Sequence, residues 1–100
     1  MLIYNITFHV AESIENQWLN WVKETQIPFL LESGLLFEPQ LTRILNDQQD
    51  GGKSYALQVK CNDMQSLTKW HKIHSATFQQ HCDIAFKQDI LFFTTVLEIV

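Results

Sequence analysis

Alternation of apolar and polar residues recurs in four short stretches of the chain and limits the folds that the chain can adopt. Residues 2–10 place Leu, Tyr, Ile, Phe and Val at every second position, which is typical of a strand with one buried face. Similar alternation predicts strands over 35–46, 53–61 and 90–99. The polar segment 47–52 is expected to be a turn, so the second and third strands should form a hairpin.

A longer stretch with helical spacing of its apolar residues follows the first strand. Ser13 is a candidate N-cap for this helix, because its side chain suits the unpaired N–H groups of a first turn. Pro28 disfavours helix at the residue before it, so we expect a kink or a division there. Gly34 is placed to end the helix.

The second helix is expected over residues 62–86, with Asn62 or Asp63 as its cap. The order of elements is then βαββαβ. With right-handed crossovers this order gives an α+β, ferredoxin-like domain, in which two helices cover one face of a four-stranded antiparallel sheet. The expected strand order 4-1-3-2 puts the second strand at an edge, where Pro39 is tolerated because it cannot donate to a neighbour. We treat residues 1–100 as one such domain.

The other face of the predicted sheet is too polar for a core and too apolar for full solvation. From the alternation of each strand we assign to this face Ile3, Asn5, Thr7, Ile44, Phe92, Thr94 and Val96. A mixed face of this kind suits packing against a second copy of the chain. We therefore expect a homodimer formed through the sheet faces. The alternative is an exposed face with isolated apolar residues.

Composition and charge argue against several functional classes. The formal net charge is −4, and the seven Lys and Arg residues are scattered, which does not favour nucleic-acid binding. Residues 1–10 carry no basic leader, and no apolar run approaches the roughly 20 residues of a membrane span. We expect a cytoplasmic protein without a membrane partner. Cys61 and Cys82 are then expected to be reduced thiols, and their spacing does not match a zinc finger.

Three of the four histidines lie close together at His71, His74 and His81, beside Cys82. At about 100° per residue all four side chains fall on or next to the apolar stripe of the second helix. His71 and His74 have a spacing that allows chelation, but His81 lies about 10 Å further along the helix axis. No HExxH motif is present. We therefore expect neither a metal site nor a cofactor.

Residues on such a stripe most often pack in the core, yet the same residues could line a pocket between helices and sheet. The candidate ligand-binding residues are Tyr4, Trp18, Trp70, His74, Phe78 and His81. The leading hypothesis is a small-molecule-binding module in which aromatic rings give apolar contact and histidines a polar anchor. One alternative is a cofactor-independent monooxygenase-like enzyme that uses His74 or His81 for proton transfer. Another is a dimeric interaction protein without a pocket. We favour a non-enzymatic role.

Several segments of the chain resemble a known family. The stretches "IYNITFHV", "WLNWVKETQIP", "GGKSYALQV" and "FFTTVLEIV" are similar to a small bacterial family known as domain of unknown function 4286, within the dimeric α/β-barrel superfamily. The resemblance implies a ferredoxin-like fold and a dimer that packs two sheets together, and it implies no established activity. Gln26 stands where that family often has a His, and Phe93 stands where an Arg is common.

The same superfamily includes cofactor-free monooxygenases, and one such group uses an Asn on the first strand with a Trp and a His on the second helix. Trp70 and His81 resemble the latter two in their spacing. Asn5, however, is expected to lie on the opposite side of its strand from the helices. The resemblance to this group is therefore incomplete.

Overall fold

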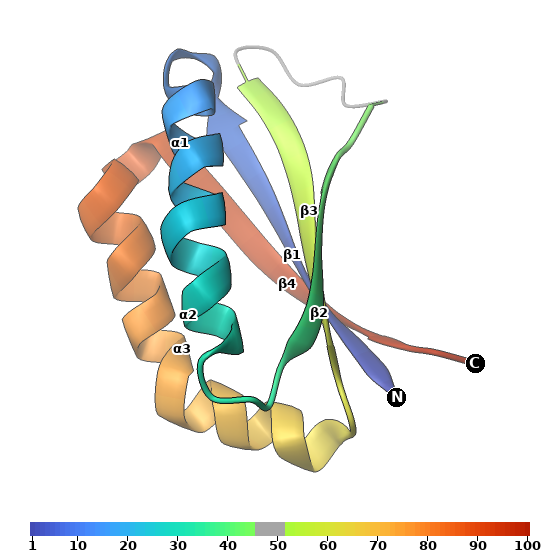
Figure 1. The fold of residues 1–100 in the computed structure, drawn as a ribbon. Helices are drawn as coiled ribbons and strands as arrows, with labels where there is room; N and C mark the ends of the chain where they lie inside the picture. The colour runs from blue at the N-terminus through green and yellow to red at the C-terminus, as the bar shows by residue number, and fades with distance from the viewer. Residues whose placement is uncertain (46–51) are drawn as a thin grey trace.

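The structure is a computed structural model that describes residues 1–45 and 52–100. Four strands form one antiparallel sheet in the order β2-β3-β1-β4, and the helices lie against one face of it (Figure 1). The strands are β1 (Leu2–Ala11), β2 (Phe37–Arg43), β3 (Gly52–Cys61) and β4 (Ile90–Glu98). The predicted α+β ferredoxin-like fold and its strand order are confirmed, with β2 at an edge. The predicted turn at 47–52 lies, except for Gly52, outside the described residues.

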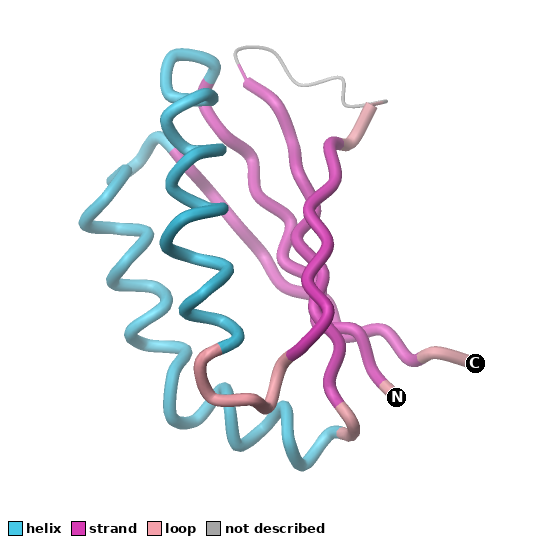
Figure 2. The backbone as a smooth tube through the Cα atoms, viewed as in Figure 1, coloured by secondary structure: helices cyan, strands magenta, loops and turns pink. Residues whose placement is uncertain are grey.

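The helical region between β1 and β2 is continuous but irregular (Figure 2). It consists of the 3₁₀ turn η1 (Glu12–Ile14), α1 (Glu15–Trp21), the π-helical turn η2 (Val22–Gln26) and α2 (Ile27–Leu31). Ser13 lies inside η1, and no side chain caps η1 or α1, so the predicted N-cap is wrong. Pro28 lies in the first turn of α2 directly after the π turn, and Ile27 before it is helical, so the predicted loss of helix at Ile27 is wrong and the irregularity is the π turn. Gly34, with φ of 77°, follows the last helical turn.

The helix α3 (Met64–Phe86) connects β3 to β4 through the short 3₁₀ turn η3 (Lys87–Asp89). Asp63 is its N-cap, because the carboxylate accepts a hydrogen bond of 2.8 Å from the backbone N–H of Ser66. This hydrogen bond lowers the pKa of Asp63, since it stabilises the ionised form. Of the two predicted caps, Asp63 is therefore the one used.

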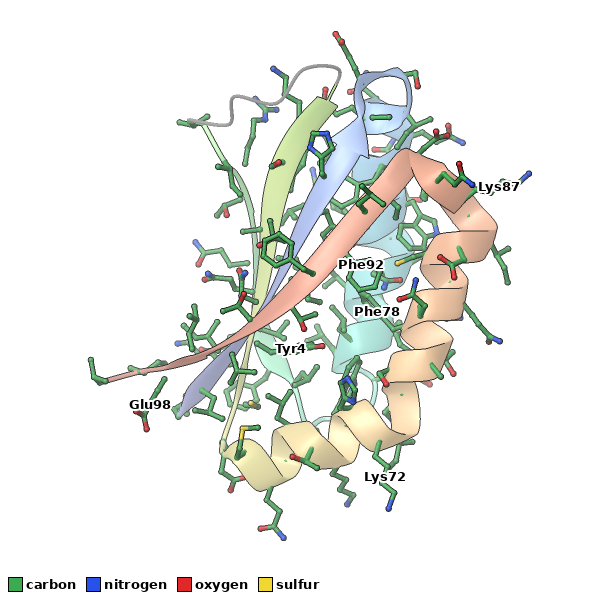
Figure 3. The ribbon with its side chains drawn as sticks, turned by 180° about the vertical axis from the view of Figure 1, so that it is seen from behind. Tyr4, Lys72, Phe78, Lys87, Phe92 and Glu98 are labelled. Carbon is green, nitrogen blue, oxygen red and sulfur yellow. The ribbon has the colours of Figure 1, made fainter. Side chains whose placement is uncertain are left out.

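The pairing of β4 with β1 decides which side chains of β4 face the helices. Tyr4 lies opposite Val96, Phe8 lies opposite Phe92, and Thr94 falls between these pairs. Directly opposed residues of antiparallel strands point to the same face. Phe92, Thr94 and Val96 therefore lie on the helix-covered face, and their predicted placement on the other face is wrong. Figure 3 shows Phe92 pointing from β4 toward Phe78 of α3, with 5.3 Å between ring centroids.

The other sheet face, which we call the open face, is not covered by any helix of the described chain (Figure 1). It carries Ile3, Asn5 and Thr7, as predicted. The backbone N–H of Ile44 donates to the carbonyl of Ser54, which lies opposite His9, so Ile44 also belongs to the open face, as predicted. From β4 it carries Leu91, Phe93, Thr95 and Leu97. In β4 the even-numbered and the odd-numbered positions both carry large apolar residues, so alternation could not distinguish the two faces of this strand.

A β-bulge changes the face of the sheet on which the first residues of β2 lie. Phe37 pairs with Lys60 and Gln40 with Gln58, so three steps on β2 match two on β3. Glu38 lies in this bulge with φ of 52°, a conformation that a bulge often requires. The bulge turns Phe37 to the open face, although its spacing from Leu41 would place the two side chains on one face of a regular strand.

Aromatic rings fill the layer between helices and sheet. Phe8, fully buried at the centre of β1, contacts Trp18 of α1, Phe78 of α3 and Phe92 of β4, with ring centroids 5.1 to 6.5 Å apart. Burial of such side chains supplies most of the driving force for folding. No helix in the described part of the chain is long and apolar enough to cross a membrane.

Candidate functional site

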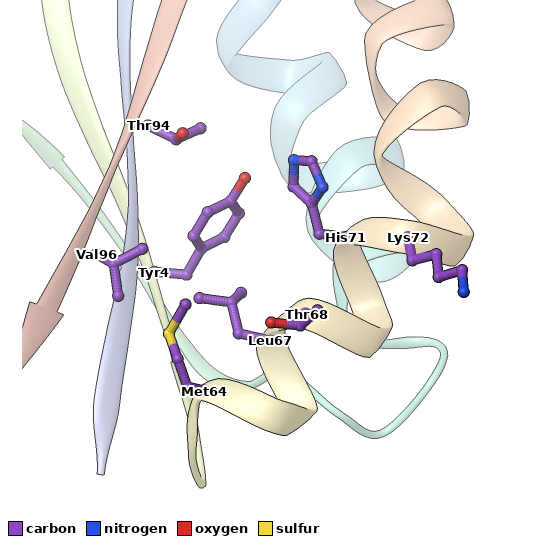
Figure 4. A pocket seen from close by; sticks show the side chains of 8 residues that line it. All are labelled: Tyr4, Met64, Leu67, Thr68, His71, Lys72, Thr94 and Val96. Carbon is purple, nitrogen blue, oxygen red and sulfur yellow. The ribbon is translucent and has the colours of Figure 1, made fainter.

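A groove of about 600 Å³ lies between the first half of α3 and the strands β1 and β4 (Figure 4). We call it the α3–β4 groove. Its apolar lining is Met64, Leu67 and Val96, and its polar lining is Tyr4, Thr68, His71, Lys72 and Thr94. The register of β4 creates this site, because it turns Thr94 and Val96 toward α3 rather than away from it.

The groove continues along α3 into a smaller hollow of about 300 Å³. Tyr4, His71 and Thr94 line both parts, so they stand at the junction. The smaller hollow adds the aromatic residues Trp70, Phe78 and Phe92 and the polar residues Ser75 and Gln79. A ligand with an apolar body therefore meets hydrocarbon or aromatic surface on either side of a polar junction.

Tyr4 provides the most enclosed polar atom of this junction. Its side chain is 6% exposed, its ring packs 5.8 Å from that of Trp70, and its hydroxyl points into the space between Thr94 and His71 (Figure 4). Burial raises the pKa of the Tyr4 phenol, and a hydrogen bond with Thr94 lowers it in part. The raising effect is the larger, and a phenol is protonated at neutral pH even with its ordinary pKa, so the Tyr4 hydroxyl is available as a donor.

The structure brings together only some of the predicted ligand-binding residues. Tyr4, Trp70 and Phe78 line the groove or its continuation. Trp18 does not, because its fully buried ring packs against Phe8 and Tyr55.

The two predicted histidines also lie away from the groove. His74 packs edge-on against Phe29 at 6.0 Å between ring centroids, and beside Trp70 at 5.9 Å. His81 packs against the same Phe29 at 4.8 Å, on the flank of α3 that faces α2. Both imidazoles therefore take part in the packing between α2 and α3.

His71 is the histidine that the site-residue prediction missed. Helical spacing places all three histidines of α3 on or beside its apolar face. That spacing does not indicate which edge of the apolar face borders a cavity. The groove borders the flank toward β4, on which His71 lies. A correct register for β4 would have identified His71, because Thr94 and Val96 then face the same flank.

A second hollow lies on the outer side of the helices, between η2, α2 and α3, with a volume of about 610 Å³. We call it the outer hollow. Its apolar lining is Pro28, Phe29 and Leu31, and the acidic residues Glu24 and Glu32 also line it. His81 also borders it, and its Nδ1 atom is buried without a hydrogen-bond partner among the described residues.

Neither a metal centre nor the oxygenase arrangement is assembled in the described part of the chain. No three His, Cys, Asp or Glu side chains lie close enough together there to hold a metal ion. Asn5 lies on the open face, where its side chain donates to Thr7 Oγ1 at 3.0 Å and accepts from Gln58 Nε2 at 3.2 Å. It is therefore separated by the sheet from Trp70 and His81.

Another polar contact on the helix-covered face joins the helical region to the sheet. The Tyr55 hydroxyl donates to the carboxylate of Glu15, and the Arg43 guanidinium lies 5.7 Å from the centroid of the Tyr55 ring. Burial and the hydrogen bond to Glu15 raise the pKa of Tyr55, and Arg43 opposes them. Tyr55 and Glu15 line neither the groove nor the outer hollow, so we interpret this contact as structural.

The topology and the groove together define a small ferredoxin-like α+β protein. The chain belongs to the family DUF4286, described as a domain of unknown function, whose sequence profile matches residues 1–100. This confirms the family resemblance. No curated protein matches the chain in sequence.

Solved structures share the fold at low sequence identity. An EthD (ethyl tert-butyl ether) family protein from Bacillus halodurans C-125 has 13% identity, a TM-score of 0.71, and full coverage of both chains. A dimeric ferredoxin-like protein from an uncultured marine organism has 12% identity and a TM-score of 0.64, covering 99% of this chain and 94% of the other. A hydroxynitrile lyase from Passiflora edulis has 11% identity and a TM-score of 0.66, covering 99% and 95%. At such identities these likenesses establish the fold and no activity.

Proposed function

We propose that this protein is a cytoplasmic homodimer that binds a small molecule in the α3–β4 groove of each protomer. The observation that carries the proposal is the enclosure of the Tyr4 hydroxyl between Thr94 and His71, at the junction of two partly apolar hollows. Binding sites for small molecules typically combine an apolar lining with a few converging polar groups. The outer hollow has a similar volume, but its lining does not converge on a buried hydroxyl.

The homodimer is proposed through the open face. Large apolar side chains of β4 remain uncovered on this face, with Leu91 67% exposed and Phe93 63% exposed. Between them and β3 the hydrogen-bonded side chains of Asn5, Thr7 and Gln58 offer polar pairing. Related solved structures with this fold include dimeric ferredoxin-like proteins. In this proposal Phe93 and Leu91 take the place that the sequence had assigned to Phe92 and Val96.

Binding of the neutral, environment-sensitive dye Nile red tests the groove. Thr68 is exposed and lines the groove, so Thr68→Trp should fill it without entering the core. Lys69 is the exposed neighbour that does not line the groove, which makes Lys69→Trp a matched control. We expect saturable dye fluorescence with the unchanged protein and with Lys69→Trp, and a loss of at least about tenfold in affinity for Thr68→Trp. Equal dye binding by the two variants, or none by the unchanged protein, would refute the proposed site.

A further inference from the structure

We infer that the ligand of the α3–β4 groove is an amphipathic organic anion, with an apolar body and one carboxylate placed beside Tyr4, Thr94 and His71. The inference rests on the proposed function and names the chemical class of the ligand. Three properties of the groove support it: the hydrogen-bond character of its junction, the signs of the charges around it, and the separation of its apolar surface from its polar surface.

The junction is rich in hydrogen-bond donors. Tyr4 and Thr94 are hydrogen-bonded to each other, and two hydroxyls that share one hydrogen bond still have one O–H left for a ligand. Whichever tautomer it adopts, the His71 imidazole always carries at least one N–H. The Tyr4 phenol is protonated at neutral pH. A carboxylate, which only accepts hydrogen bonds, is therefore well matched to these groups.

The charged residues that line the groove favour an anion, and Glu98, on the same face of β4, lies beyond Val96 and outside the lining. The chain has 11 acidic and 7 basic residues, yet neither part of the groove is lined by Asp or Glu among the described residues. Lys72 lies at the rim, with its ammonium group directed away from Tyr4 (Figure 4). Lys72 therefore adds positive potential at the mouth and makes no direct contact with the junction. The outer hollow, of similar volume, has Glu24 and Glu32 instead.

The apolar surface is placed to receive a hydrocarbon or aromatic body. On one side of the junction lie Leu67 and Val96, and on the other lie Phe78 and Phe92. A fully hydrated inorganic anion would gain nothing from these walls, whereas an apolar body gains about 25 cal/mol for each Å² that it removes from water. The combination selects an anion with an apolar body over a free inorganic ion.

Three ligands with the same hydrocarbon chain distinguish the charge preference from simple apolar binding. Decanoate, decan-1-ol and decylamine are each used to displace Nile red from the purified protein. We expect decanoate to bind at least about tenfold more tightly than decan-1-ol, because its hydrogen bonds are charge-assisted, and decylamine to bind most weakly. If all three displace the dye equally, or decylamine is preferred, the anion inference fails while the proposed binding function stands. If none displaces it and the dye itself does not bind, the proposed function fails.

Two matched pairs of variants locate the recognition. Thr94→Val removes the hydroxyl that lines the groove, whereas Thr95→Val makes the same change on the open face. His71→Leu removes the N–H at the junction, and Lys69→Met alters an exposed side chain of the same helix that lies outside the groove. We expect Thr94→Val and His71→Leu each to reduce the preference for decanoate over decan-1-ol by roughly three- to tenfold, and both controls to leave it unchanged. An unchanged preference in Thr94→Val and His71→Leu would place the anion elsewhere and overturn the inference.

Discussion

The helix-covered face and the open face of the sheet come from the same four strands, yet they differ sharply in how their apolar side chains are buried. Ile6, Phe8 and Leu57 on the covered face are fully buried, whereas Leu91 and Phe93 on the open face are about two-thirds exposed. A strand with apolar residues on both faces is expected where both faces are covered. The exposed apolar side chains of β4 are the feature that the proposed dimer through the open face would cover.

The strongest test of the difference uses the same substitution on each face. Phe8→Ala removes a ring that contacts three other rings in the core, so we expect a loss of about 3–5 kcal/mol in the free energy of unfolding. Phe93→Ala should cost less than about 0.5 kcal/mol when both proteins are measured at concentrations low enough for the chain to be monomeric, because the ring is then mostly in water. Urea denaturation measures both values. Similar losses for the two variants would show that the open face is part of a core within one protomer.

Alkaline pH probes a buried thiol of the helical layer above the covered face. Burial raises the pKa of Cys82 to about 12, from an ordinary value of 9.0. Above pH 9 the unfolded chain ionises at this residue while the folded chain stays neutral, so the folded state binds more protons and its stability falls as the pH rises toward 12. The loss from this group can reach roughly 4 kcal/mol.

Comparison with Cys82→Ala isolates this effect from the other groups that titrate in the same range. The variant starts from a lower stability, but its free energy of unfolding should fall less steeply between pH 9 and 12 than that of the unchanged protein. Guanidinium denaturation at several pH values gives both slopes. Parallel slopes would mean that Cys82 ionises in the folded protein as easily as in the unfolded chain.

Disrupting the proposed dimer should affect assembly and leave the fold intact. Phe93→Asp places a charge on the open face, and in a symmetric dimer each partner would bury one such charge. We expect the dissociation constant of the dimer to rise at least about tenfold. Ile84→Asp is the control, because Ile84 is 77% exposed on α3, away from the sheet. Sedimentation over a range of concentrations measures both, and a monomeric unchanged protein would refute the proposed dimer.

The sequence predicted the covered face well and the site poorly, for physical reasons that individual residues illustrate. Ile6 and Leu57 lie in strands that are polar on one side, so alternation alone decides their face. In β4, Phe92 and Phe93 are equally apolar, and only the pairing with β1 distinguishes them. Alternation normally sets the register of a strand, but β4 is apolar on both faces and its partner β1 lies at the other end of the chain.

The error in β4 affected one side of the predicted site, since Tyr4, Trp70 and Phe78 do line the groove or its continuation. Thr94 was predicted on the open face, whereas it lines the α3–β4 groove together with His71. His74 and His81 were chosen as polar anchors instead, and they proved to pack against Phe29. The wrong face for β4 thus left Thr94, Val96 and Phe92 out of the predicted ligand site while the fold was correct.

The smallest expected effect concerns two glutamines that sit on opposite sides of the sheet. Gln26 is fully buried in the helical layer, its Oε1 has no partner among the described residues, and its Nε2 lies only at 3.9 Å from the weak acceptor Cys82 Sγ. Gln58 lies on the open face and donates to Asn5. A buried polar atom without a partner is destabilising, whereas a satisfied one contributes about 0.5–1.5 kcal/mol.

The same substitution should therefore have opposite consequences at the two positions. Gln26→Met keeps the shape of the side chain and removes the unpaired carbonyl, so we expect the free energy of unfolding to stay unchanged or to rise by up to about 1 kcal/mol. Gln58→Met removes the hydrogen bond to Asn5 and should lower it by about 1 kcal/mol. Gln17→Met, at an exposed position of α1, controls for the substitution itself. If Gln26→Met proves the more damaging of the two, Gln26 has a polar partner in solution, and the helical layer above the covered face is less purely apolar than its packing indicates.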